Sequence, residues 1–123
     1  MDSRLELKMW RQLKGAYSVS DSANFKLIFV PIVDPSLAVE QYDTMKEALA
    51  HANGQVCFLE PKGERCVTEI KDKDITLVIG NTLKSNAEYA NADQMYKINT
   101  PRSTDLFGIN ATAIALSNWW YNQ

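Results

Sequence analysis

Apolar residues recur every three or four positions near both ends of the chain, a spacing typical of helices with one buried face. The first helix is predicted over residues 4–14, and it ends at Gly15. Ser3 and Glu6 have the Ser-x-x-Glu form of a capping box at its start. Its apolar stripe consists of Leu5, Met9, Trp10 and Leu13. A polar stretch follows, so we expect residues 1–15 to form an N-terminal helical arm.

The second terminal helix is predicted to begin after a cap at Thr104 or Asp105 and to run nearly to the C-terminus. Its apolar residues are spaced three, four, three and four apart, which places them on one face. That stripe consists of Leu106, Ile109, Ala113, Leu116 and Trp120. Trp119, Trp120 and Tyr121 make its end aromatic, which favours core packing or a subunit interface over base stacking, because no basic residues surround them.

The middle of the chain contains apolar runs that predict strands. FKLIFVPIV (25–33) and ITLVIG (75–80) have the uninterrupted apolar character of strands buried in a parallel sheet, and MYKIN (95–99) predicts a shorter strand. QVCFLE (55–60) and RCVTEI (65–70) flank a Pro-Lys-Gly-Glu turn, an arrangement that predicts a hairpin.

One helix is predicted between the strand segments at residues 25–33 and 55–60, and it stops at Asn53-Gly54. Its face is marked by Val39, Tyr42, Met45, Ala48 and Ala52. Strands that alternate with helices indicate an α/β protein. We therefore expect a single α/β domain over residues 25–123, with a largely parallel sheet and flanking helices. Ligands of such sheets bind where loops leave the carboxyl ends of strands, here after Val33, Ile79 and Ile98.

Composition narrows the functional classes. The chain has 123 residues, of which 46% are hydrophobic and 23% charged, as expected of one globular domain. No apolar run approaches the ~20 residues that a membrane span needs, and the charged N-terminus does not resemble a signal peptide, so we expect a cytoplasmic protein without a membrane partner. The net charge of −2 and the pI of 5.3 provide no basic surface for nucleic acid at the level of the whole chain.

Several kinds of chemistry find little support in the residues. GNTLKS (80–85) lacks the Gly-Lys-Ser/Thr ending of a phosphate-binding loop and the GxGxxG pattern of dinucleotide sites. His51 is the only histidine and is expected at a helix C-terminus, where the helix dipole favours it. Cys57 and Cys66 have no metal-ligand spacing, so we expect buried free thiols and no metal site.

Three segments of the C-terminal half resemble the SpoU-type (SPOUT) RNA 2′-O-methyltransferases. VIGNTLKS, KINTP and GINATAIAL follow one another in the order of that family's three motifs, and Gly108 to Thr112 fall on the five positions of its last motif. The resemblance covers roughly residues 74–120. It implies a knotted α/β domain, usually dimeric, that binds S-adenosylmethionine largely through backbone groups of three loops. The cofactor-binding residues that it implies are Ile79, Gly80, Asn81, Ile98, Asn99, Ile109 and Asn110.

The sequence departs from this family at catalytic positions. Thr82 replaces the acid of the second motif, and residues 34–54 contain no arginine where the family has its catalytic one. The catalytic residues are therefore unknown. The sequence favours a SpoU-like protein with a pocket for S-adenosylmethionine, either an RNA ribose methyltransferase or a degenerate relative of one. The alternative is a non-catalytic α/β protein that binds a small ligand or a protein partner. A homodimer is expected, with RNA or a protein as its partner.

Overall fold

The computed structural model describes residues 3–17, 24–29, 40–79, 90–101 and 108–123. Six strands in these ranges form one sheet in the order β2-β1-β5-β3-β6-β4, and every neighbouring pair is parallel. This confirms the predicted α/β class. The strands are β1 (Asn24–Phe29), β2 (Glu40–Gln41), β3 (Gln55–Leu59), β4 (Arg65–Cys66), β5 (Asp74–Ile79) and β6 (Met95–Lys97).

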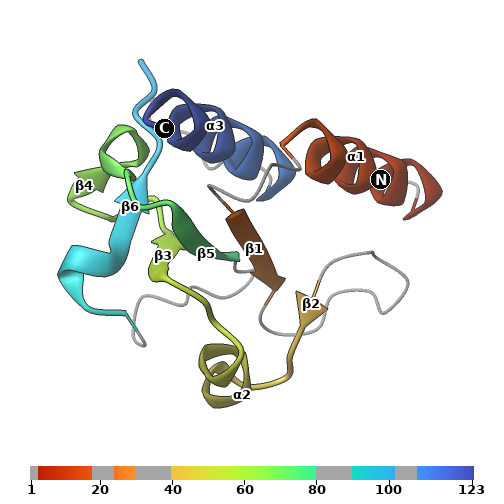
Figure 1. Ribbon diagram of the computed structural model, residues 1–123, viewed down its shortest axis with the longest axis horizontal. Coiled ribbons are helices and arrows are strands. Elements are labelled where there is room, and N and C mark those ends of the chain that lie inside the picture. Colours follow the sequence, from red (N-terminus) through yellow and green to blue (C-terminus); the bar gives the residue numbers. More distant parts are fainter. Residues whose placement is uncertain (1–2, 18–23, 30–39, 80–89, 102–107) are drawn as a thin grey trace.

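Helices cover both faces of the sheet (Figure 1). The N-terminal helix and the C-terminal helix lie on one face, and a short helix lies on the other. Two 3-10 turns complete the described elements. The helices are α1 (Ser3–Ala16), α2 (Met45–Ala50) and α3 (Gly108–Tyr121), and the 3-10 turns are η1 (Val67–Glu69) and η3 (Ala92–Gln94).

The position of strand β5 between two covered faces explains why its sequence does not alternate between apolar and polar residues. Ile75, Leu77 and Ile79 pack in the larger core, under α1 and α3, whereas Val78 packs in the smaller core with Met45 of α2. A strand that is covered on both faces needs apolar residues at successive positions. The continuous run ITLVI therefore marks the centre of the sheet.

The N-terminal helix, predicted over 4–14, is α1. Its Trp10 is buried in the same core cluster as Ile75 and Trp119, with Met9 and Leu13 packed against that cluster. Burial of a whole indole contributes a large apolar area. The division of the chain into an arm and a body stays a prediction.

The predicted hairpin over 55–70 is wrong. Strand β6 lies between β3 and β4 and pairs parallel with both, through Leu59 and Tyr96 on one side and Tyr96 and Arg65 on the other. A short turn between two apolar runs indicates a hairpin locally, but backbone pairing with a later segment overrides that local preference. The carboxyl end of β3 is thereby placed inside the sheet.

The predicted helix with a face from Val39 to Ala52 is too long. Glu40 and Gln41 form β2 beside Ile28 and Phe29, whereas Val39 lies outside the described residues. The helix begins only after Thr44, whose hydroxyl accepts a hydrogen bond from the Glu47 backbone N–H at 3.2 Å. Thr44 and Glu47 have the Thr-x-x-Glu spacing of a capping box, a signal that marks this start in the sequence.

The C-terminal helix is confirmed as α3, but its buried face is rotated from the predicted stripe. Trp119 is fully buried, whereas Trp120 is 48% exposed. Trp119 donates a hydrogen bond from Nε1 to the Asp72 carbonyl at 2.7 Å and meets the Phe25 ring edge-on at 5.7 Å. These two partners decide which indole enters the core. The predicted caps and Leu106 lie outside the described residues.

Gly54 has a backbone conformation that β3 requires. Its φ is +64°, and an added Cβ would lie 2.0 Å from the Asp74 carbonyl oxygen of β5. The Thr76 hydroxyl donates to the Asn53 carbonyl and accepts from the Asn53 N–H, each at 2.8 Å, so the entry to β3 is fixed on β5. Any side chain at residue 54 would separate the two strands.

Gly54→Ala is expected to lower the free energy of unfolding by about 2–4 kcal/mol, because it adds both a backbone clash and a strained φ. Gly15→Ala is the matched control: its added Cβ meets nothing within 4 Å, and it lies in α1. This control should be neutral or stabilise by up to about 1 kcal/mol. Urea denaturation followed by circular dichroism measures both. Equal stabilities of the two variants would contradict the structure.

Candidate functional site

The all-parallel sheet brings the carboxyl ends of its strands to one edge. Strand β5 ends at Ile79, β3 at Leu59 and β6 at Lys97. Phe58 of β3 pairs with Val78 of β5, so these two strands end at the same level. Open α/β sheets bind ligands at this edge, beyond the strand ends.

The start of α3 lies at the same edge. A Cβ added to Gly108, the first residue of α3, would lie 3.1 Å from Cγ2 of Ile79. Ile79 and Ile109 belong to one core cluster, and Ile98, just beyond β6, packs against it. The end of β5 and the start of α3 therefore lie against each other, and the segment after β6 packs against the same core cluster.

The structure thus places three of the seven cofactor-binding residues that the sequence predicts, namely Ile79, Ile98 and Ile109, in or against one core cluster. Asn99 and Asn110 lie beside these isoleucines in the chain and are exposed. Gly80 and Asn81 lie outside the described residues. Ile79 and Ile109 are themselves buried, so among the described residues of this set the exposed amides are the most accessible to a ligand.

The Asn99 backbone already has a role within the chain. Burial alone would raise the pKa of the Cys66 thiol, but hydrogen bonds from the Thr68 hydroxyl and from the backbone N–H groups of Thr68 and Asn99 outweigh it and lower that pKa. Cys66 ends β4, the edge strand next to β6. The Asn99 N–H therefore lies near the Cys66 thiol, at the edge of the sheet.

The end of β3 is not expected at this edge from the sequence, because the pattern of residues 55–70 predicts a hairpin. The turn after β3 contains Glu60, which is buried, and the Glu60 N–H donates to the Tyr96 carbonyl at 3.0 Å. The Gly63 N–H in turn donates to the Glu60 carbonyl at 3.0 Å. In the sequence, Glu60 directly follows the apolar stretch VCFL, and a charged residue at that place is the feature that could have drawn attention to this turn.

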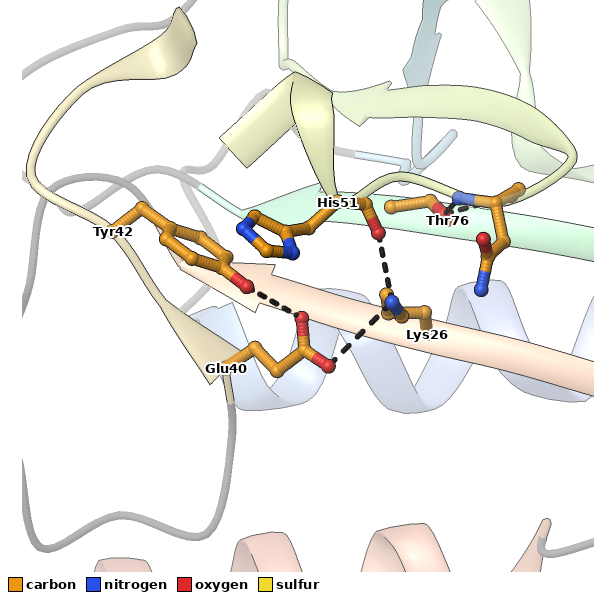
Figure 2. Close-up of polar contacts among 6 residues, drawn as sticks. Lys26, Glu40, Tyr42, His51 and Thr76 are labelled. Carbon is orange, nitrogen blue, oxygen red and sulfur yellow. Dashed lines mark hydrogen bonds and ion pairs between the residues drawn. The ribbon is translucent and has the colours of Figure 1, made fainter. Parts of the chain in front are cut away.

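A second polar cluster surrounds the C-terminal end of α2 (Figure 2). The Lys26 ammonium donates to the His51 carbonyl at 2.7 Å and lies 3.6 Å from Oε1 of Glu40. The Tyr42 hydroxyl donates to Glu40 Oε2 at 3.0 Å, and the Tyr42 ring stacks on the His51 ring at 4.8 Å.

This cluster is a structural clamp. A cation at the last carbonyls of a helix is favoured by the helix dipole, and Lys26 supplies it while it also pairs with Glu40 of β2. Burial and the negative charge of Glu40 raise the pKa of the Tyr42 phenol, which keeps it a hydrogen-bond donor. The position of His51 at the end of α2 confirms the expected location of the histidine.

Arg65, the one arginine in the six described strands, is held by structural contacts. Its Nε lies 3.6 Å from Glu69 Oε1, its Nη1 donates to the Asp93 carbonyl at 3.1 Å, and its guanidinium lies 5.2 Å from the centre of the Tyr96 ring. In the part of the chain that the structure describes, no three His, Cys, Asp or Glu residues gather as metal ligands. No helix within the same ranges is long and apolar enough to cross a membrane.

The fold places the chain among α/β proteins with a parallel sheet. No protein-family model matches the chain, and no curated protein sequence matches it. Among solved structures, it is similar to a crystal structure of a "putative RNA methyltransferase" from Bacillus anthracis, with a TM-score of 0.66. The two chains are 17% identical, and the match covers 96% of this chain and 86% of the other. A similarity at this level of identity shows a shared fold.

The two cysteines should differ sharply in reactivity. Burial, reinforced by the negative charge of Asp72, raises the pKa of Cys57 to about 12, whereas the pKa of the partly exposed Cys66 is lowered. Only thiolates react readily with alkylating reagents. Native protein at neutral pH should therefore take up one iodoacetamide group, at Cys66, as peptide mass spectrometry would show. Cys66→Ser should abolish this uptake until the protein is unfolded, and fast labelling of Cys57 in the native state would contradict the structure.

Proposed function

We propose that this chain is a SpoU-like protein that binds S-adenosylmethionine at the carboxyl edge of its sheet. The observation that carries the proposal is that Ile79, Ile98 and Ile109, one from each of the three segments that resemble the SpoU motifs, belong to or pack against one core cluster. The resemblance rests on sequence order alone, whereas this placement in the structure is independent of it. The fold shared with the Bacillus anthracis protein supports the same conclusion.

The residues present at this edge fit such a cofactor. The half-buried Ile98 offers an apolar contact for a ligand, and the close approach of Gly108 to Ile79 leaves backbone groups near the edge. Asn99 and Asn110 are the exposed amides that would hydrogen-bond the polar parts of the ligand. Gly80 and Asn81 complete the predicted set of contacts. When bound, S-adenosylmethionine supplies an activated methyl group.

The substrate class that we propose is RNA, which would be methylated at a ribose hydroxyl. We further propose that the protein acts as a homodimer in the cytoplasm. Methyl transfer to a hydroxyl needs a group that takes or steers its proton. Arg65 is engaged with Glu69 and with the Tyr96 ring, and Thr82 stands where the SpoU family has an acid. The proposal therefore includes the case in which this chain is a degenerate SpoU-like protein that retains the cofactor site but does not transfer the methyl group.

A second candidate function is that of a non-catalytic binding protein. It is favoured by the apolar surface of α3, where Trp120 and Tyr121 are exposed next to a buried Trp119. Exposed aromatic residues at one end of a helix are common at protein interfaces. A protein partner or a second copy of the chain would cover them.

Wild-type protein is expected to bind S-adenosylmethionine in isothermal titration calorimetry. Asn110→Ala should weaken binding about tenfold, because it removes the side-chain amide at the start of α3. Asn118→Ala is the matched control: it lies on the same helix, and its amide hydrogen-bonds only the helix's own Ile114 carbonyl among the contacts that the structure describes. This control should bind like the wild type.

Absence of binding by the wild type, to both S-adenosylmethionine and S-adenosylhomocysteine, would refute the cofactor site. Equal weakening by Asn110→Ala and Asn118→Ala would place the ligand elsewhere. Native mass spectrometry of protein purified without added ligand provides an independent measurement.

A homodimer that uses the exposed end of α3 should dissociate when a charge is placed there. Trp120→Glu is expected to give a monomer in sedimentation velocity at micromolar concentration, whereas the wild type sediments as a dimer. Leu49→Glu is the control, because Leu49 is 39% exposed on α2, which covers the opposite face of the sheet. A monomeric wild type would contradict the dimer, and a dimeric Trp120→Glu variant would exclude this surface.

A further inference from the structure

The basic residues of the chain are unevenly distributed. Four of its 13 lysines and arginines lie in α1, together with one of its 15 acidic residues. The chain as a whole carries a net charge of −2, so α1 is a positive segment of an otherwise acidic protein. Basic residues that gather along one helix favour a partner with negative charge, even when the overall balance is acidic.

Two of these cations lie on the solvent face of α1. Met9 and Leu13, four residues apart, pack against the larger core, and Trp10 beside them is buried in it. Lys8 and Arg11 lie on the opposite side of the helix and are exposed. Residues three apart are neighbours on a helix surface, so these two cations lie close together. We call Lys8 and Arg11 the basic face of α1.

No described residue neutralises the charges of the basic face. The Lys8 and Arg11 side chains form no ion pair and no hydrogen bond with any residue that the structure describes. Lys14, one turn further on, is also exposed, but it has an interaction within the chain. The neighbouring α3 contains no charged residue, so it offers no counter-ion.

The basic face lies on a helix that approaches the candidate site. Figure 1 shows the C-terminal end of α1 next to the start of α3, and the two helices contact each other. The start of α3 supplies Gly108 and Asn110 to the candidate edge. Arg11 lies five residues before the end of α1, which is about 8 Å along the helix axis. A strand of nucleic acid that enters the edge can therefore run along the basic face.

We propose that the basic face of α1 binds backbone phosphates of the RNA whose ribose lies at the candidate edge. This inference rests on the proposed function and gives its substrate a second contact surface. Lysine and arginine side chains bind phosphate oxygens without reading the sequence, and such contacts position a nucleic acid on a protein.

An anionic membrane is another polyanion that a basic helix can meet. Helices that bind membranes in this way insert their apolar face among the lipids. The apolar face of α1 is already occupied, because Trp10 is only 1% exposed and packs in the core. RNA needs only the solvent face of the helix, so the structure favours RNA over a lipid surface.

The experiment measures the binding of a short, fluorescein-labelled single-stranded RNA of mixed sequence by fluorescence anisotropy over a series of salt concentrations. Lys8→Gln/Arg11→Gln removes both charges and keeps long polar side chains that favour a helix. It should weaken RNA binding about tenfold and lower the slope of log affinity against log salt by about one to two.

Lys46→Gln/Lys73→Gln is the matched control, because it removes two positive charges from exposed lysines of other elements. Lys46 lies on α2, at the opposite face of the sheet, and Lys73 directly precedes β5. This control should bind RNA like the wild type. The α1 variant should retain the wild-type affinity for S-adenosylmethionine and the wild-type thermal stability, because both substituted residues are exposed.

The outcomes separate this inference from the proposed function. Equal RNA affinity of the wild type and the α1 variant overturns the inference, and so does equal weakening by the control. A wild type that binds S-adenosylmethionine but no RNA also overturns it and leaves the cofactor site intact. RNA binding through the basic face without any binding of S-adenosylmethionine refutes the cofactor site alone. Binding to phosphatidylserine vesicles in preference to RNA, lost in the α1 variant, would assign the basic face to a membrane and overturn the inference.

Discussion

The parallel pairing of β5 with β1 and β3 is the constraint on which the rest of the structure depends. Six residues of β5 pair with β1, and Ile75 to Val78 pair with β3 on the other side. A strand in that position has no face toward water, so helices must cover both sides. Parallel strands also cannot be joined by tight turns, and each connection has to return across the sheet. The covering helices, the two cores and the shared edge of strand carboxyl ends all follow from this arrangement.

The C-terminal helix is fixed to this sheet at both ends. At its start, Gly108 contacts Ile79, where β5 ends. At its end, the Trp119 indole donates to the Asp72 carbonyl, and the Asn122 amide donates to the carbonyls of Thr68 and Ile70, each at 2.9 Å. These carbonyls precede β5 and lie outside the strands, so the helix satisfies backbone acceptors that the sheet leaves over, those of Ile70 and Asp72 in part-buried hydrogen bonds. The packing that closes the core is therefore the same packing that brings α3 to the candidate site.

The candidate site divides into parts of different chemical character. Ile79 and Ile109 are buried in the core beneath this edge, a feature that any α/β protein could have, and they say little about which ligand binds. Polar groups decide which ligand a small-molecule site selects, and Asn99 and Asn110 are the exposed amides near this edge. The clamp of Lys26, Glu40 and Tyr42 contributes instead to the attachment of β2, because its charges are matched with one another.

The sequence by itself determined the α/β class, the terminal helices and the central strand, because these depend on local periodicity and on uninterrupted apolar runs. It also marked Ile79, Ile98 and Ile109, because each follows or begins a recognisable segment. Only the tertiary structure decided that β6 separates β3 from β4, that Trp119 rather than Trp120 is buried, and that Glu60 is buried beside Tyr96. Each of these depends on a partner far away in the sequence. Strand order and burial are set by backbone pairing and packing across such distances, which local patterns do not encode.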